Sequence, residues 1–187
     1  IGDGSLGGKA RGLAFLNSLV QKYNLSRKYD DVKISIPRTI VVATDYFDQF
    51  IVENGLQYVI DSEISDEEIL SEFVSSRLPE GLVEQLKSYI DTVRAPLAVR
   101  SSSKLEDSSY QPFAGVYSTY MIPLVENKSQ MLRMLGKAIK SVYASVFYAG
   151  SRTYIQTTAN LLSEEKMAVV IQSICGSQHD GLYYPML

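Results

Sequence analysis

Three segments of this sequence carry residue types that could bind a phosphate-bearing ligand, and the first is Gly7-Gly8-Lys9-Ala10. Two adjacent glycines allow the backbone to approach a ligand closely, and the free N–H groups at a helix start attract anions. Lys9 adds a mobile positive charge that can reach a phosphate. The P-loop pattern Gly-x-x-x-x-Gly-Lys-Ser/Thr is absent from the sequence. On its own, the segment is more typical of a flexible helix start with a solvated lysine.

The second segment is Ala98-Val99-Arg100-Ser101-Ser102-Ser103, and Glu106-Asp107 follow it. An arginine at the carboxyl end of a buried strand would lie over the place where open α/β sheets bind ligands. Its guanidinium offers two parallel hydrogen bonds to phosphate oxygens. The alternative is an exposed serine-rich turn with a surface salt bridge.

The third segment is a polar loop that passes through Phe113-Ala114-Gly115 and leads to Thr119. A loop with Ala114 and Gly115 at its tip can fold over a phosphate chain, because its backbone N–H groups are not obstructed by side chains. A plain hairpin loop is the alternative.

Helices and short strands must position these segments. Apolar residues recur at helical spacing after Gly8 and from Met131 to Ala149. Helix starts are expected at Thr44 as an N-cap, at Ser65 within a capping box, and at Pro79. Apolar runs predict strands at Thr39–Val42, Pro96–Val99, Val116–Leu124 and Met167–Ile171. Helices alternating with short strands predict an α+β fold of α/β type.

The composition limits the classes of function and partner that the chain could have. The chain has 187 residues, 45% of them hydrophobic, and a net charge of -3, which makes nucleic acid a poor partner. The single cysteine, Cys175, can form neither an internal disulfide nor a Cys-rich zinc site. No apolar run has the length of a membrane span. A cytoplasmic protein without a membrane partner is expected.

The three segments occur in an order that resembles the amino-terminal ATP-binding domain of the phosphoenolpyruvate synthase and pyruvate phosphate dikinase family. Further landmarks of that resemblance are Ile36-Pro37, Val41-Val42-Ala43-Thr44 and Lys166 to Gln172. It covers nearly the whole chain and is weakest from Asn54 to Val93. It implies an ATP-grasp fold, in which two lobes clamp ATP with Mg²⁺ between them. Residues 1–187 would be the amino-terminal part of that fold, and the metal ligands would lie in a second lobe outside this chain.

The resemblance also implies roles for individual residues. Lys9 and Arg100 would hold the ATP phosphates and act in catalysis, while Glu106 and Asp107 would orient Arg100 and the loop. The other residues expected to bind ATP are Ala114 and Gly115 on the closing loop, Thr119 at its base, and Gln172, Ser173 and Ile174 along the adenine slot. His179 does not resemble the family's phosphohistidine motif and is expected to be a solvated turn residue.

The activity implied is cleavage of ATP to AMP with transfer of a phosphoryl group to a histidine on a separate domain, from which an acceptor-binding domain receives it. The chain alone is expected to be inactive as a dikinase. Two alternatives are a non-catalytic nucleotide-binding or scaffolding module, and an ATP-grasp ligase that forms an acyl phosphate and releases ADP.

Overall fold

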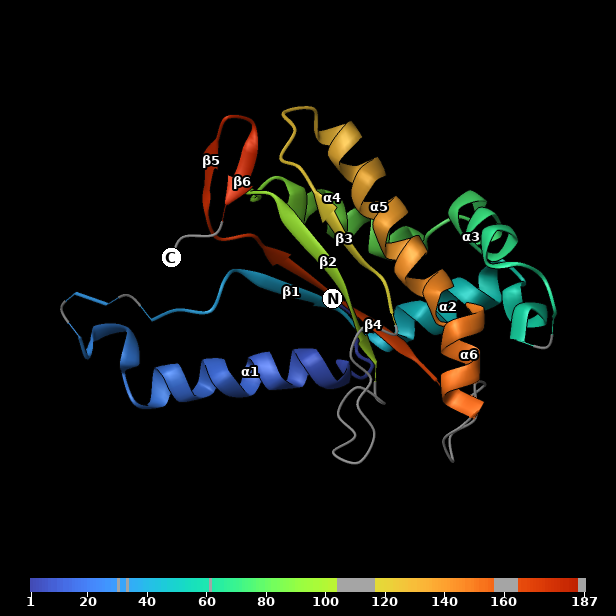
Figure 1. Ribbon diagram of the computed structural model, residues 1–187, viewed down its shortest axis with the longest axis horizontal. Helices are drawn as coiled ribbons and strands as arrows, with labels where there is room; N and C mark the ends of the chain where they lie inside the picture. Colours follow the sequence, from blue (N-terminus) through green and yellow to red (C-terminus); the bar gives the residue numbers. More distant parts are fainter. Residues whose placement is uncertain (30, 33, 61, 104–116, 157–164, 185–187) are drawn as a thin grey trace.

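The computed structural model describes residues 1–29, 31–32, 34–60, 62–103, 117–156 and 165–184. They form a four-stranded antiparallel sheet with most of the helices on one side, a long helix α1 on the other, and a small hairpin (Figure 1). The strands of the sheet, in spatial order, are β1 (Thr39–Val42), β4 (Met167–Ser173), β2 (Leu97–Ser103) and β3 (Thr119–Ile122). The fold is therefore α+β, and its sheet is antiparallel throughout the described residues.

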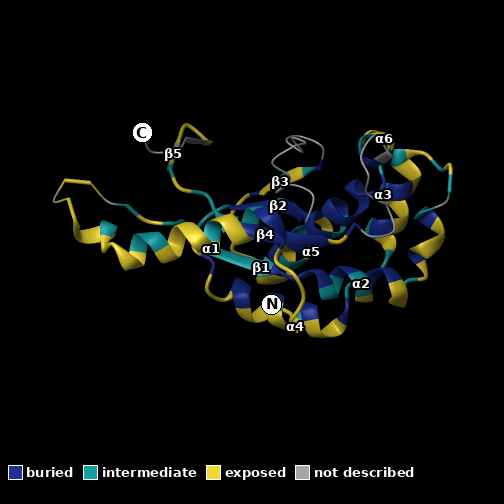
Figure 2. Ribbon diagram, turned by 90° about the horizontal axis from the view of Figure 1, so that it is seen from below, coloured by how far each residue is buried: buried dark blue, intermediate teal, exposed yellow. Residues whose placement is uncertain are grey.

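One face of the sheet, called here the core face, is apolar and covered by helices. Successive side chains of a strand point to opposite faces, so the paired residues Val99, Ile171 and Val169 of β2 and β4 share this face. Helices α2 (Thr44–Glu53) and α5 (Lys128–Ser145) pack on it, and α3 (Asp66–Ser75) and α4 (Glu80–Ile90) pack on α5. Buried residues accordingly concentrate in the strands and the inner turns of these helices (Figure 2).

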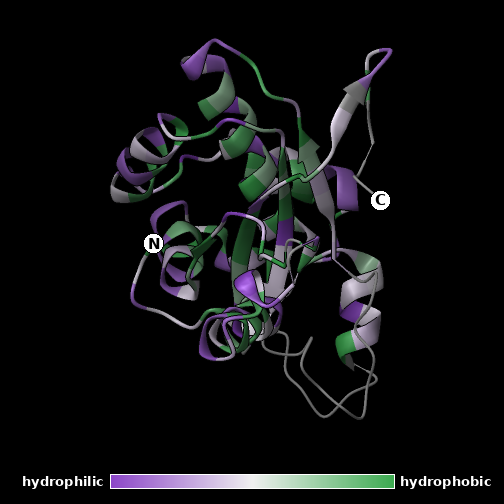
Figure 3. Cartoon of the chain, turned by 90° about the vertical axis from the view of Figure 1, so that its left-hand side faces the viewer, coloured by the Kyte–Doolittle hydropathy of each residue, from purple (hydrophilic) through white to green (hydrophobic). Residues whose placement is uncertain are grey.

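Aromatic side chains fill the space between these helices. The Phe50 ring lies 5.7 Å from that of Phe73 and 5.5 Å from that of Tyr143, between ring centroids. Phe47 makes an edge-to-face contact with Tyr143 at 5.0 Å and stacks on Phe147. Hydrophobic residues gather in the central strands and hydrophilic residues in the outlying turns (Figure 3). This cluster makes the helical side of the sheet a densely packed core.

Several helix boundaries follow from local sequence. The capping box is confirmed, because the Ser65 hydroxyl accepts from Glu68 N–H at 3.2 Å while the Glu68 carboxylate accepts from Ser65 N–H at 2.8 Å. Pro79 is the N-cap of α4, which begins one residue later than predicted. The prediction of Thr44 as an N-cap is wrong, since Ala43 occupies that position and Thr44 begins α2.

The helix predicted from Met131 to Ala149 is interrupted. It ends at Ser145, and α6 (Ala149–Gln156) follows. The hydroxyl of Ser151 donates to Ser145 O at 2.6 Å, and Ser145 donates its own hydroxyl to Val142 O at 2.7 Å. These hydroxyls satisfy carbonyls that a continuing helix would have bonded itself, and the chain changes direction there.

Helix α1 (Gly7–Lys22) runs along the opposite side of the sheet and extends beyond it (Figures 1 and 2). It buries only Gly7, Gly8 and Ala10, all in its first turn, while Phe15 and Leu16 are exposed. The apolar residues predicted at helical spacing therefore do not enter the core. The remaining elements are η1 (Leu25–Arg27), η2 (Leu56–Ile60), β5 (Ser177–His179) and β6 (Leu182–Tyr184). Of the described helices, none combines the length and the hydropathy required to cross a bilayer.

Candidate nucleotide-binding site

Arg100 lies in the middle of β2, paired with Val170 of β4 and Thr119 of β3. The prediction that Arg100 ends a strand of an open α/β sheet is wrong: the strand continues to Ser103, and its neighbours are antiparallel. Strand alternation nevertheless puts Arg100, Ser102, Thr119 and Gln172 on the face opposite the core. This α1 face, defined by these four residues, brings together three of the predicted site residues.

The guanidinium of Arg100 is half-buried. Among the residues that the structure describes, none forms a hydrogen bond or an ion pair with it. Removing a charged group from water is costly unless the group is paired, and a guanidinium has five N–H donors to satisfy. A guanidinium on a central strand of the sheet suits an anionic ligand, because it can donate two parallel hydrogen bonds to phosphate or carboxylate oxygens.

The three serines after Arg100 are buried, which excludes the exposed serine-rich turn for the described residues 101–103. Ser102 anchors the start of α1, since its hydroxyl donates to Leu6 O at 2.8 Å and accepts from Ala10 N–H at 3.1 Å. It thus caps a helix whose own N-cap residue, Leu6, makes no side-chain cap. One backbone N–H of the anion-attracting helix start is consequently used within the protein.

Gly7 is required at this junction. A Cβ on Gly7 would lie 1.8 Å from the carbonyl oxygen of Ser102, and its φ of +68° is one that side chains rarely adopt. Only glycine tolerates both the lack of space for a Cβ and the positive φ. The backbone of α1 can therefore approach β2 this closely. The close approach sets the distance of Lys9 from the strand.

Lys9 reaches β2 beyond the last residue that pairs with β3. Its ammonium donates to the Ser101 hydroxyl at 3.1 Å, and Ser101 immediately follows Arg100. Alternation puts the Ser101 side chain on the core face, so Lys9 and Arg100 approach neighbouring positions of one strand from different directions. The structure thus brings the two predicted phosphate-binding cations to adjacent positions of β2, Arg100 itself and Ser101, which Lys9 contacts.

Thr44 and Asp45 bind the loop that precedes α1, a contact that the sequence analysis missed. The Asp45 carboxylate accepts from Asp3 N–H at 3.0 Å and from Gly4 N–H at 3.1 Å, and the Thr44 hydroxyl accepts from Ser5 N–H at 2.9 Å. Partial burial raises the pKa of Asp45, but hydrogen bonds from four backbone N–H groups outweigh it and hold that pKa below its ordinary value. An acid in the first turn of a predicted helix was the available signal.

The opposite end of the sheet holds Gln172, Ser173 and Ile174. The Gln172 amide donates to the Thr39 hydroxyl at 3.0 Å, and Ile174 N–H donates to Pro96 O at 2.9 Å. Ile174 lines a cavity of about 630 Å³, whose walls are Arg94, Pro96, Met121, Ile122, Pro123, Leu124, Ile174 and Gly181. This cavity is mostly apolar, as a site for a planar base would be.

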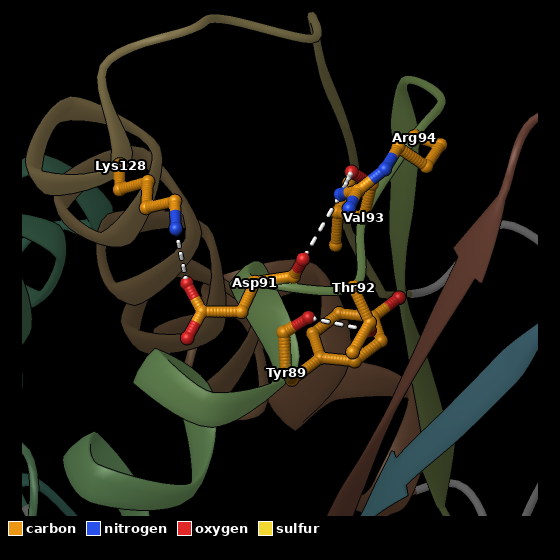
Figure 4. A network of polar contacts seen from close by, with 6 residues as sticks. All are labelled: Tyr89, Asp91, Thr92, Val93, Arg94 and Lys128. Carbon is orange, nitrogen blue, oxygen red and sulfur yellow. Dashed lines mark hydrogen bonds and ion pairs between the residues drawn. The ribbon is translucent and has the colours of Figure 1, made fainter.

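Arg94 is held in the wall of this cavity by the turn between α4 and β2 (Figure 4). Its guanidinium donates to Asp91 O at 2.9 Å and to Val93 O at 2.6 Å. In the same turn the Thr92 hydroxyl donates to Tyr89 O at 2.7 Å. These hydrogen bonds stabilise the turn that precedes β2, the strand that carries Arg100.

Four residues of the predicted site, Ala114, Gly115, Glu106 and Asp107, lie outside the described residues. After the loop, the Tyr117 hydroxyl donates to the buried carboxylate of Glu165 at 3.1 Å, a contact that the sequence did not indicate.

His179 is exposed, as expected, but it ends β5 beside the turn rather than lying within it. The turn residues Asp180 and Gly181 both have positive φ, as in a two-residue hairpin turn. No three His, Cys, Asp or Glu side chains gather as a metal site among the described residues.

Sequence similarity to known proteins extends over most of the chain. The profile of the pyruvate phosphate dikinase AMP/ATP-binding domain matches residues 3–185. The uncharacterized phosphotransferase YvkC of Bacillus subtilis is 28% identical over 151 residues, which are 81% of this chain and 17% of that protein. The phosphoenolpyruvate synthase of Aeropyrum pernix is 25% identical over 173 residues, 81% of this chain and 20% of that protein. The chain thus spans about a fifth of the length of these relatives, and it belongs to the pyruvate phosphate dikinase AMP/ATP-binding domain family.

Proposed function

We propose that this chain binds ATP along β2 on the α1 face, as the ATP-binding part of a phosphotransferase related to phosphoenolpyruvate synthase. The adenine would lie at the Ile174 end, and the phosphates would lie between Arg100, Thr119 and Lys9. Membership of an AMP/ATP-binding domain family supports the ligand, and the arrangement of the residues supports its direction.

The order of contacts along β2 is the observation that carries this proposal. Ser173 lies opposite Leu97, Gln172 opposite Ala98, and Thr119 opposite Arg100, while Lys9 contacts Ser101. At a rise of about 3.3 Å per residue, these contacts span roughly 13 Å of strand. An apolar cavity at one end and two cations at the other match an extended ligand with a base at one end and phosphates at the other.

The two cations would contribute differently. Arg100 is held by the central strands of the sheet and would neutralise phosphate oxygens with a fixed pair of N–H donors. Lys9 has a flexible stem, and its ammonium would exchange its Ser101 contact for a phosphate oxygen. Ala114 and Gly115 would close over the phosphates from the loop, as the family resemblance implies.

The dikinase chemistry is proposed from the family resemblance. The β-phosphoryl group of ATP would pass to a histidine on a separate domain and then to an acceptor bound elsewhere, while AMP leaves and water takes up the γ-phosphoryl group as phosphate. Mg²⁺ would neutralise charge on the phosphate oxygens, with ligands from the second lobe of an ATP-grasp fold. The residues of this chain would bind and orient the nucleotide.

The test is to incubate the full-length protein with Mg²⁺ and ATP, to separate the nucleotide products and to examine the protein for acid-labile phosphate. AMP together with a phosphoenzyme is the expected result. ADP would overturn it in favour of a ligase or an ordinary kinase, and an absence of turnover despite ATP binding would favour a binding module. Arg100→Ala should weaken ATP binding, whereas Arg27→Ala, which removes an exposed arginine in η1, should not.

A further inference from the structure

The loop formed by residues 1–6, called here the N-terminal loop, is bound along the junction between β1 and α2. Ala43 N–H donates to Ile1 O at 2.9 Å, and Thr44 N–H donates to Ser5 O at 3.0 Å. In the other direction, Ser5 N–H donates to the Thr44 hydroxyl. Thr44 therefore bonds both polar backbone groups of Ser5, one with its side chain and one with its backbone.

Asp45 holds the middle of the same loop with both carboxylate oxygens. Its Oδ2 accepts from Asp3 N–H and its Oδ1 from Gly4 N–H. The glycines on either side of Asp3 are needed for this contact. A Cβ on Gly2 would lie 2.4 Å from Asp45 Oδ1, and a Cβ on Gly4 would lie 2.5 Å from the Asp45 nitrogen. Gly-Asp-Gly thus forms a backbone cradle for one carboxylate.

The N-terminal loop continues without a break into the residues that carry Lys9. Leu6 O accepts from the Ser102 hydroxyl, Gly7 lies against the Ser102 backbone, and Lys9 follows two residues later. The rest of α1 is largely exposed, so its position depends on these first residues. The start of α1 is accordingly held between Thr44 and Asp45 on one side and Ser102 on the other.

We propose that Thr44 and Asp45 are positioning residues, which fix the N-terminal loop so that the Lys9 ammonium meets the phosphates of the bound nucleotide. This proposal rests on the proposed function, because it requires ATP as the ligand. Neither residue contacts the nucleotide; both act through the loop on Lys9. The carboxylate remains ionised at neutral pH, since its backbone hydrogen bonds favour the charged form.

The first test compares ATP with adenosine as ligands of Asp45→Asn in the full-length protein. An amide at this position keeps one acceptor and turns an NH₂ group toward the second N–H, so the cradle loses one of its two hydrogen bonds. ATP affinity should fall about tenfold, as expected for loss of one hydrogen bond to a charged group, while adenosine affinity stays unchanged. An equal fall for both ligands would indicate a general structural defect and overturn the proposal.

Asp48→Asn is the matched control. Asp48 also lies in α2, but its carboxylate pairs with Lys166 and does not contact the N-terminal loop. This variant should bind both ligands like the wild-type protein. Equal loss of ATP affinity in Asp48→Asn and Asp45→Asn would also contradict the proposal.

A double-mutant cycle shows whether Asp45 acts through Lys9. In a Lys9→Ala background, Asp45→Asn should have no further effect on ATP affinity, and an additive effect would overturn the proposal. Thr44→Val removes the hydroxyl that accepts from Ser5 and should weaken ATP selectively, whereas Thr44→Ser should restore binding. Failure of wild-type protein to bind ATP would refute the proposed function, while normal ATP binding by both Asp45→Asn and Thr44→Val would refute the positioning role alone.

Discussion

The two faces of the central sheet use the same strands for different purposes. On the core face, Val99, Val169 and Ile171 are fully buried beneath α2 and α5. On the α1 face, the alternate positions hold Arg100 and Gln172, both half-buried, as well as the buried Val170. Because side chains alternate along a strand, adjacent residues of β2 can contribute separately to stability and to binding. Strand register therefore decides which residues of β2 lie on the α1 face and which lie in the core.

Packing differs between the faces as well. The core face is filled by aromatic rings in contact with one another. On the α1 face, α1 and β1 leave a cavity of about 400 Å³, lined by Leu6, Ala10, Leu13, Ala14, Asn17, Ile36, Pro37, Arg38, Thr39 and Val41. Substitutions on the core face should therefore change the free energy of unfolding, and substitutions on the α1 face should change ligand affinity.

The largest effect on stability is expected for Phe50→Ala in α2, one of the helices that cover the core face. Phe50 is fully buried between Phe73 and Tyr143, so its loss leaves a cavity. The free energy of unfolding should fall by about 3–5 kcal/mol. Urea denaturation measures this loss, and ATP affinity measured where the variant is still folded should be unchanged. A loss below about 1 kcal/mol would mean that the cluster can collapse around the gap.

Arg100→Ala should lower the affinity for ATP and leave the free energy of unfolding nearly unchanged. The loss of hydrogen bonds from a charged donor should lower ATP affinity by about 1.5–3 kcal/mol. The free energy of unfolding should change by no more than about 0.5 kcal/mol, because Arg100 is only half-buried and lies on the face of the sheet opposite the core. Isothermal titration and thermal unfolding separate the two quantities. Arg100→Lys should give an intermediate affinity, since lysine retains the charge but not the paired donors; stability loss without affinity loss would refute the division between the faces.

Tyr143→Phe sharpens the comparison within the core. Burial and the nearby Asp45 and Asp48 carboxylates hold the pKa of Tyr143 above its ordinary value, and its buried hydroxyl has no hydrogen-bond partner in the described part of the chain. Removal of this hydroxyl should leave the free energy of unfolding unchanged or raise it by up to about 1 kcal/mol. Tyr117→Phe is the control, because that hydroxyl bonds Glu165 and its removal should destabilise the protein. Chemical denaturation measures the free energy of unfolding of both variants. An equal loss of stability in the two variants would contradict this prediction.

The smallest effect is expected at the surface, for Asp91→Asn. The Lys128–Asp91 pair is 2.6 Å long, but its side chains are 70% and 60% exposed (Figure 4). Solvent screening should limit the loss to about 0.5 kcal/mol or less, with no change in ATP affinity. Thermal unfolding at low and high salt measures this difference, and a loss above about 1 kcal/mol would show that the turn before β2 depends on the pair.

The sequence by itself determined the features that depend on residues close together in the chain. The capping box at Ser65, the strand beginning at Met167 and the glycines before Lys9 follow from local spacing. The order of the family motifs likewise identified the domain type, which the profile match over residues 3–185 confirms. Local patterns suffice because caps, strand alternation and glycine backbone angles involve interactions between near neighbours.

Only the tertiary structure decided which distant segments meet. The antiparallel pairing of β2 with β3 and β4 places Arg100 within a strand, and no local pattern specifies a partner 70 residues away along the chain. Asp45 likewise has its role through backbone N–H groups 41 and 42 residues earlier. Backbone N–H groups are the same in every residue but proline, so the sequence carries no sign of which ones a carboxylate will bind.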